Sequence, residues 1–355
     1  MTTSGSATPG WYPDPYDPVN LRYWDGLTWT ESIAPGVAGA PPVAGASSGL
    51  GDIGSWLGDT FKVLFARIVP IALLLYVIPT VGLAALVVVG RSVLVGMRYD
   101  RLAGELQGFN PSDLVLVGVI GALLVLVSAV CWLAATHQLY FSHIGQPPSL
   151  GASLAAGVRR LPQAIGWGLV LAVLMALVMA VALGLPIVLA ATVSNQFLIL
   201  FVVTIPLLIA GGIWIGIKLY YFGTVVVVGP RGANPISTSF SLSAGRWWAT
   251  LGRALLLWIV IYGVSIAGQL IFNVATQVIL AGSLQFNSIT GEIQVDGQDI
   301  STLDVIDFGR FVPSVPILVV LAVLYGFNQA LSQALGISGG TALYRRAGGP
   351  AGEGA

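Results

Sequence analysis

The chain has few charged side chains. Lys, Arg, Asp and Glu make up 8% of its 355 residues, against about 25% in an ordinary soluble domain. Fifteen basic and fifteen acidic residues give a net charge of zero, so no nucleic-acid partner is expected. Because 56% of the residues are hydrophobic and the mean hydropathy is +0.87, we expect an integral membrane protein whose first partner is the lipid bilayer.

Residues that carry chemistry are also scarce. The single cysteine, Cys131, excludes a disulfide framework within the chain. The only histidines, His137 and His143, are six apart and fall on opposite sides of a helix, which makes a poor metal pair. There is no phosphate-binding glycine loop followed by lysine. We therefore expect no metal, no cofactor and no enzymatic activity. The first twenty residues lack the regions of a cleavable signal peptide, so insertion is expected to rely on the membrane spans.

Long apolar runs, by contrast, are abundant. Crossing the hydrocarbon layer takes about 20 apolar residues, and runs of this length are helical because backbone groups in lipid must bond within the segment. The sequence therefore predicts an all-α polytopic membrane domain over residues 51–346 with six transmembrane helices. Their predicted bounds are 68–89, 114–136, 165–192, 197–228, 254–281 and 312–343.

Basic residues near the span ends predict the orientation. Six spans place both termini on one side of a plasma (inner) membrane, and that side carries nine Lys and Arg residues: Lys62, Arg67, Arg159, Arg160, Arg231, Arg246, Arg253, Arg345 and Arg346. The other side carries four: Arg91, Arg98, Arg101 and Arg310. The positive-inside rule then places both termini in the cytoplasm.

Three similar stretches precede spans one, three and five. Each has apolar residues at four-residue spacing: Ile53, Leu57 and Phe61; Leu150, Leu154 and Val158; Ile236, Phe240 and Ala244. This spacing predicts short amphipathic helices at the membrane surface, with Trp56, Trp167, Trp247 and Trp248 as interfacial aromatics. The starts are 97 and 86 residues apart, which favours a threefold pseudo-repeat of one interfacial helix and two spans. The alternative is that any loop before such a span has this composition.

The third unit, VVVVGPRGANPISTSFSLSAGRWWATLGRALLLWIVI, resembles the membrane domain attached to some glycerophosphodiester phosphodiesterases. The resemblance covers roughly residues 51–345 and implies a fold but no chemistry. The catalytic barrel of that family has no counterpart in this chain.

Polar and small residues form stripes within the spans. Gln269, Asn273 and Gln277 lie on one face of span five, and Asn328, Gln329, Ser332 and Gln333 lie at overlapping depth on span six. These side chains either hold the two helices together or line a path for a solute. On span three, Gly168, Ala172, Ala176, Ala180 and Gly184 follow at four-residue steps. This stripe predicts close approach of Gly212 and Gly216 on span four, or of a second copy in a homo-oligomer. Lys218 is expected to snorkel; a charge on a transport path is the alternative.

The front of the chain carries a different pattern. In GWYPDPYDPVNLRYWDGLTWTE, residues 10–31, the pair Asp25-Gly26 predicts a two-residue hairpin turn that places Trp24 opposite Leu27, Tyr23 opposite Thr28 and Arg22 opposite Trp29. We expect a small β-hairpin module over 10–33, with a disordered tail at 1–9, an Ala/Gly/Pro linker at 34–50 and a disordered tail at 347–355. The aromatic residues Trp11, Tyr12, Tyr23, Trp24 and Trp29 form its core, or a groove for a proline-rich cytoplasmic partner.

This stretch resembles a short actinobacterial domain of unknown function. The matching residues are Gly10, Trp11, Tyr12, Asp14, Pro15, Arg22, Tyr23, Trp24, Asp25, Gly26, Trp29 and Thr30. The resemblance implies an actinobacterial membrane protein with a small cytoplasmic module and no catalytic role. Together these features favour a membrane scaffold or adaptor with a cytoplasmic recognition module. The alternative is a transporter or lipid-handling protein that uses the amides of spans five and six.

Overall fold

The computed structural model describes residues 10–13, 20–24, 28–35, 50–100, 102–108, 110–230, 232–280, 284–286, 293–295, 298–299, 305–307 and 313–350. The chain divides into two compact units, Met1–Gly51 and Asp52–Ala355. The first contains only strands and the second contains all the described helices.

The N-terminal unit is a three-stranded antiparallel sheet. Its strands β1 (Gly10–Pro13), β2 (Asn20–Trp24) and β3 (Trp29–Pro35) lie in the order β1-β2-β3. The module therefore has one strand more than the predicted hairpin, and β3 continues two residues beyond the predicted boundary at 33.

The predicted register of the hairpin is wrong. Trp24 pairs with Trp29 rather than with Leu27, and Arg22 pairs with Ile33 across an irregularity in the ladder. The connection is thus four residues long, and Asp25 and Gly26 lie outside the described residues. The longer connection lets the Trp24 and Trp29 rings meet edge to face, with centroids 5.2 Å apart, a favourable aromatic geometry.

The second unit is a multi-pass membrane domain. Among the described residues, six helical stretches are long and apolar enough to cross a membrane: Ile68–Val95, Pro111–His143, Leu150–Thr192, Phe201–Val228, Trp247–Val278 and Val315–Arg346. All six predicted spans coincide with these stretches. Several helices extend beyond the predicted bounds, because the helical backbone continues past the apolar run that marks a span.

The helical elements follow one another along the chain as α1 (Ile53–Ala66), α2 (Ile68–Ala72), η1 (Leu73–Val77), α3 (Ile78–Val95), α4 (Pro111–His143), α5 (Leu150–Met179), η2 (Ala180–Gly184), α6 (Leu185–Thr192), η3 (Asn195–Leu200), α7 (Phe201–Lys218), α8 (Phe222–Val228), α9 (Pro235–Ser243), α10 (Trp247–Leu280) and α11 (Val315–Arg346). Span four is not one continuous helix, since a turn at residues 219–221 separates α7 from α8.

Two π-helical turns interrupt the spans, and a proline explains each. The turn η1 ends two residues before Pro79, and η2 ends two residues before Pro186. Proline has no backbone N–H and its ring crowds the carbonyl four residues earlier. A wider turn at that point relieves the crowding without ending the helix.

Short strands lie between the spans at the end of the domain opposite α1. Strand β4 (Arg98–Asp100) pairs with β5 (Glu105–Gln107) and also with β9 (Val305–Asp307), so the connection after span one is joined to the connection before span six. Strands β6 (Leu284–Phe286), β7 (Ile293–Val295) and β8 (Gln298–Asp299) form a separate sheet.

The threefold pattern appears in the burial of the three surface segments. Counted from the first apolar residue of each unit, the fourth position is Trp56, Ser153 or Ser239, and the eighth is Thr60, Gly157 or Ser243. All six residues are buried. The buried face is therefore the same in each unit.

Each buried face contacts the end of an even-numbered span. Trp56 Nε1 donates to the Gly339 carbonyl of span six (3.1 Å), Ser153 Oγ to Gln138 Oε1 of span two (2.6 Å), and Ser239 Oγ to the Lys218 carbonyl of span four (2.8 Å). The first unit thus packs on the last span, which closes the three units into a ring.

Three buried tyrosines, one from each unit, meet at this end of the domain. Tyr344 lies 5.7 Å from Tyr140 and 6.2 Å from Tyr221, measured between ring centroids. Each of the three tyrosines lies near the end of an even-numbered span and is directly preceded in the sequence by a leucine or a tyrosine. Their contacts hold spans two, four and six together where the surface segments join them.

Two details of the predicted surface helices are wrong. The middle one is not a separate helix, because α5 runs without a break from Leu150 into span three. The predicted apolar stripe of α1 is also not its buried face: Ile53 is exposed, whereas Trp56, Thr60 and Leu64 are buried. Trp56 is fully buried rather than interfacial, since its indole packs against α11 and donates to the main-chain carbonyl of Gly339 within that helix.

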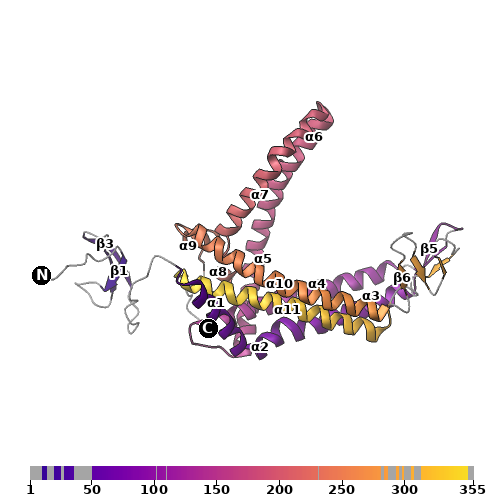
Figure 1. Ribbon diagram of the computed structural model, residues 1–355, viewed down its shortest axis with the longest axis horizontal. Coiled ribbons are helices and arrows are strands. Elements are labelled where there is room, and N and C mark those ends of the chain that lie inside the picture. Colours follow the sequence, from indigo (N-terminus) through magenta and orange to yellow (C-terminus); the bar gives the residue numbers. More distant parts are fainter. Residues whose placement is uncertain are drawn as a thin grey trace. The chain divides into compact units, whose positions relative to one another are not determined.

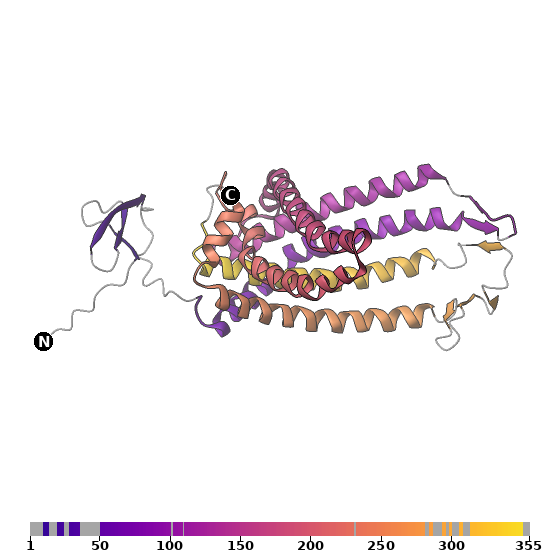
Figure 2. The ribbon, with the colours of Figure 1, turned by 90° about the horizontal axis from the view of Figure 1, so that it is seen from above.

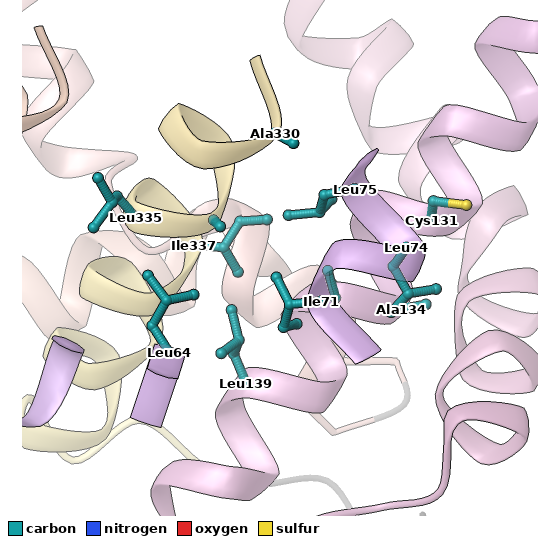
Figure 3. Close-up of a cluster of buried hydrophobic side chains, with 12 residues drawn as sticks. Leu64, Ile71, Leu74, Leu75, Cys131, Ala134, Leu139, Ala330, Leu335 and Ile337 are labelled. Atoms are coloured by element: carbon teal, nitrogen blue, oxygen red, sulfur yellow. The ribbon is translucent and has the colours of Figure 1, made fainter. Parts of the chain in front are cut away.

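The apolar core joins the first and last spans. Leu64, Ile71, Leu74 and Leu75 pack against α4 and α11, as Figure 3 shows. No described residue of α5, α6 or α7 belongs to the fully buried part of this cluster. The hairpin formed by α5, η2, α6, η3 and α7 instead leaves the other spans at a steep angle (Figures 1 and 2).

Candidate functional site: a groove along α11

One face of α11 remains uncovered within the membrane domain and lines two adjoining cavities. The larger, about 400 Å³, is lined by Trp132, Thr136, Tyr220, Gly223, Thr224, Ala254, Leu257, Trp258, Ile261, Gln333, Gly336, Ile337 and Gly340. The smaller, about 210 Å³, is lined by Leu75, Pro79, Thr80, Leu83, Leu124, Ser128, Tyr325, Gly326, Gln329 and Gln333. Gln333 lines both, so we treat them as one feature, the α11 groove.

The α11 groove follows one side of the helix because its residues recur at three- or four-residue steps. Gly326, Gln329, Gln333, Gly336 and Gly340 follow one another along this side. From Gly326 to Gly340 the helix rises about 21 Å, at 1.5 Å per residue. The groove is therefore long enough to accommodate an extended chain rather than a compact solute.

Polar groups occur at separated points along mostly apolar walls. The glutamines Gln329 and Gln333 are both exposed and lie one turn apart. Thr80 is buried, and its Oγ1 has no hydrogen-bond partner among the described residues. A buried hydroxyl of this kind costs free energy unless something bonds to it. The two exposed glutamine amides are available to hydrogen-bond to a molecule in the groove, whereas the Thr80 hydroxyl is covered by Gly326.

The contacts around the groove place it in the hydrocarbon layer. Thr80 lies near the middle of the span Ile68–Val95. Gly326 faces it so closely that a Cβ at position 326 would overlap the Thr80 hydroxyl. The level of Gly326 is therefore near the middle of the bilayer. The groove runs from this level toward the end of the domain that carries α1.

Helix α8, which follows the hairpin, lines one extremity of the groove. Gly223 of α8 lies against Trp132 of α4, where a Cβ would come within 2.9 Å of the indole. Farther along, the hairpin diverges from α4 and α10, as Figure 1 shows. Gln329, Gln333 and Trp258 in its walls are exposed, so the groove is open sideways, toward the lipid.

The predicted polar residues of spans five and six separate into three groups. Asn328 is buried and joins the helices, with its Nδ2 donating to the Ser265 carbonyl at 3.4 Å and its side chain packed on Gly268. Ser332 forms a second link, 2.8 Å from Ser265 Oγ. Gln329 and Gln333 line the groove. Ser265 was missed at the sequence level, because a lone serine in an apolar run carries no periodic signal.

The remaining three amides do not meet span six. Gln269, Asn273 and Gln277 are all exposed on α10, and Gln269 Nε2 donates to Asn273 Oδ1 of the same helix at 3.1 Å. Of the two alternatives given for the polar residues, joining span five to span six is therefore not the role of these three amides in the structure. Their four-residue spacing does place them on one face, but α11 packs on another.

The small-residue stripe of span three also lacks the contact predicted within the chain. Gly168, Ala172, Ala176 and Ala180 are exposed and Gly184 is half-buried. A Cβ added at Gly168, Gly184, Gly212 or Gly216 would meet nothing within 4 Å. Close packing of spans three and four at these residues is therefore contradicted, and packing against a second copy stays a prediction.

Lys218 and the two histidines lie against aromatic rings or a main-chain carbonyl, and neither ring nitrogen of His137 has a hydrogen-bond partner among the described residues. Lys218 is the last residue of α7, and its Nζ lies 5.9 Å from the ring centroids of Trp214 and Phe240. His143 Nε2 lies 3.2 Å from the Ser338 carbonyl, and His137 packs on Phe141. Among the described residues, no cluster of His, Cys, Asp or Glu could hold a metal ion.

One ion-pair cluster lies outside the spans. Asp59 of α1 accepts hydrogen bonds from Arg346 (2.6 Å) and Arg345 (3.4 Å) at the end of α11. The hydrogen bond from the Arg346 guanidinium holds the pKa of the Asp59 carboxyl below its usual value. This cluster joins the beginning and the end of the membrane domain.

In the N-terminal unit, the backbone pairing places Trp11 opposite Tyr23 and Tyr12 opposite Arg22. The side chains of Trp11, Tyr12 and Tyr23 lie outside the described residues. Trp29 is 37% exposed although it contacts Trp24. Part of the aromatic surface is thus open to solvent.

The comparisons with known proteins concern this small unit alone. Residues 9–42 match the model of a family described as a protein of unknown function (DUF2510). No curated protein and no solved structure matches the chain. The resemblance of the membrane domain to the phosphodiesterase-associated domain therefore remains a prediction. The chain is an integral, multi-pass membrane protein that carries an N-terminal domain of a family of unknown function.

Proposed function

We propose that the membrane domain binds an amphipathic, lipid-like molecule in the α11 groove. The observation that carries this proposal is the pair of adjoining cavities along α11, which are open toward the lipid and carry Gln329 and Gln333 on otherwise mostly apolar walls. A molecule that enters from the bilayer is surrounded by apolar side chains along most of its length. Its polar part bonds to the two amides.

The chemistry of the walls favours an amphipath over an ion or a sugar. Among the described residues, no Lys, Arg, Asp or Glu lines either cavity, so a charged solute would be left without a counter-ion in a low-dielectric layer. Uncharged amides, hydroxyls and aromatic rings suit esters, hydroxyls and acyl chains. This supports a lipid-handling or lipid-transport role in which the groove amides bind the lipid rather than pack helices together.

The test is lipid retention by the purified full chain. We expect native mass spectrometry from mild detergent to detect bound lipid, and a photoactivatable phospholipid to label α11 or α4. The double variant Gln329→Leu, Gln333→Leu should retain about 3- to 10-fold less lipid, since an amide hydrogen bond in a membrane contributes about 0.6–2 kcal/mol. The matched control is Gln269→Leu with Asn273→Leu, which removes two amides outside the groove. Equal lipid retention by both variants would contradict the proposal.

A second role is supported by the N-terminal unit. We propose that it acts as a recognition module that docks a proline-rich segment of a cytoplasmic protein, so that the chain also serves as a scaffold or adaptor. The exposed Trp29 beside Trp24 supports this, because aromatic surfaces of this kind bind polyproline helices. Deleting residues 1–33 should leave the membrane domain folded and abolish co-purification of the partner. Co-purification unchanged by the deletion would count against this role.

This second role requires the module to face the cytoplasm. The nine basic residues predicted on that side support this orientation. So does the contact between α1 and the end of α11, which brings both ends of the membrane domain to one side. Labelling of single cysteines introduced at Ser4 and Glu353 with a membrane-impermeant maleimide, in a Cys131→Ala background, tests the orientation. Labelling in intact cells would contradict it.

A further inference from the structure

The exposed amides of α10 are in the wrong environment for a single copy of the chain. Gln269, Asn273 and Gln277 follow one another at four-residue steps and are all exposed. Apolar side chains surround them: Ile266 is 43% exposed and Leu270 is 60% exposed on the same side of the helix. The outward surface of span five thus presents a polar stripe within an apolar face.

Contacts between helices fix the depth of this stripe. Gly268, next to Gln269, packs directly on Asn328 of α11. Gly326, half a turn away on α11, packs on Thr80, which lies near the middle of the first span. Gln269 and Asn273 are therefore near the middle of the hydrocarbon layer, where no water is available to bond them.

The hydrogen bond between the two amides satisfies only part of their capacity. It uses one N–H of Gln269 and the Oδ1 of Asn273. Each amide carries two N–H donors and a carbonyl oxygen, so three N–H groups and the Gln269 Oε1 still face the lipid. Polar groups left unpaired in hydrocarbon cost several kcal/mol each. A partner that supplies both donors and acceptors at the same depth removes this cost.

We propose that this amide stripe is the interface through which α10 pairs with α10 of a second copy of the chain. An amide is complementary to another amide because it both donates and accepts. In a two-fold symmetric pair of parallel helices, each residue meets its own counterpart at the same depth. Gln269 and Asn273 therefore meet the same amides of the other copy, and such interactions hold membrane helices together.

The shape of α10 near the stripe suits this pairing. Gly263 is exposed about three turns before Asn273 and flanks the stripe, and a Cβ at Gly263 would meet nothing within 4 Å of the same chain. Small residues of this kind allow two helices to approach closely. The interface does not involve Gln329 or Gln333, so it is independent of lipid binding in the α11 groove.

The experiment measures cross-linking between copies of the full chain in phospholipid vesicles. In a Cys131→Ala background, oxidation of a Leu270→Cys variant should join two copies by a disulfide. A Val173→Cys variant on α5, similarly exposed, should not. Adding Gln269→Leu and Asn273→Leu should reduce the joined fraction about 3- to 10-fold. Asn273→Gln, which keeps an amide, should restore most of it.

Two results would overturn the proposal. One is an unchanged joined fraction in the double leucine variant, provided that its thermal unfolding shows a folded protein. The other is a disulfide within one chain between Leu270→Cys and Val203→Cys, which would assign the stripe to the hairpin of the same chain. Gln329→Leu with Gln333→Leu serves as the control, because it should reduce lipid retention and leave the joined fraction unchanged.

Discussion

The hairpin of α5 and α7 and the pair α10 and α11 have similar compositions but pack in opposite ways. Both pairs contain glycines within long apolar runs. In the second pair, a side chain of the facing helix fills the space beside the contact glycine: Asn328 beside Gly268 and Leu257 beside Gly339. In the hairpin, Gly168, Gly184, Gly212 and Gly216 meet no side chain. Small residues permit close approach, but a side chain that fills the space is what joins the helices.

The hydrogen bonds differ in the same way. Ser265 bonds to Ser332 and its carbonyl accepts from Asn328, so α10 and α11 are linked by polar groups as well as by fit. Between α5 and α7, no such link occurs in the described part of the chain. In lipid, where apolar surfaces gain little from meeting one another, this difference decides which helices pair. It also explains why the α11 groove stays open on the side of the hairpin.

The largest expected effect follows from removing the residue that closes the ring of three units. Trp56→Ala removes a fully buried indole and its hydrogen bond to the Gly339 carbonyl. We expect the free energy of unfolding to fall by about 3–5 kcal/mol, measured by denaturant titration in detergent micelles. Trp248→Ala provides the control, because Trp248 is 78% exposed. Similar losses for both variants would show that α1 does not hold the ring closed.

A pair of glycines on one helix tests the packing comparison directly. A Cβ at Gly157 of α5 would lie 2.6 Å from the Val130 carbonyl oxygen, so Gly157→Ala should destabilise the protein by about 1–3 kcal/mol. Gly168→Ala on the same helix should be neutral or stabilise it by up to about 1 kcal/mol, because alanine favours the helix and the site is open. Both are measured by thermal unfolding. Equal effects of the two substitutions would mean that α5 is packed equally tightly at Gly157 and at Gly168.

The smallest expected effect concerns the ion pair at the end of α11. The pKa of Asp59 is lowered in the folded protein, chiefly by its hydrogen bond from Arg346. A lowered pKa contributes stability that is present above the unfolded value and is lost as the pH falls through the folded one. We therefore expect stability to be unaffected down to about pH 5 and to fall below about pH 4.

The side chain of Asp59 is 37% exposed, so solvent screening keeps this contribution below about 1 kcal/mol. Asp59→Asn should lower the unfolding temperature slightly at pH 7 and reduce its dependence on pH in the acid range. A variant with the full pH dependence of the original protein would show that other carboxyl groups cause it.

Several features followed from the sequence because they depend on neighbouring residues. The six spans depend only on the length of apolar runs. The starts of α1, α4, α5 and α9 were not among the predictions, although they follow Asp52, Asn110, Ser149 and Asn234, whose side chains accept backbone N–H groups of the first turn. The interruption of span four was not predicted, because Lys218, which directly precedes the turn at residues 219–221, was expected only to snorkel.

The candidate site was only partly predictable. The sequence showed seven polar residues in spans five and six, but not which would join helices, line a groove or face outward. Adjacent residues in α11, Asn328 and Gln329, have different roles because they lie about 100° apart on the helix. Thr80, the buried hydroxyl of the groove, is 246 positions from the glycine that it faces. No local pattern connects such a pair.

The sequence by itself determined that this protein lies in a membrane, how often it crosses and where its aromatic module begins. These properties depend on the hydropathy and residue types of one continuous segment, so residues that are close in the sequence are enough to determine them. Only the tertiary structure decided which faces of the spans meet, that Trp56 is buried and Trp29 partly exposed, and that α11 keeps an open groove. Those outcomes depend on whether a side chain from a distant helix fits and bonds at the same depth, and that fit exists only once the helices are packed together.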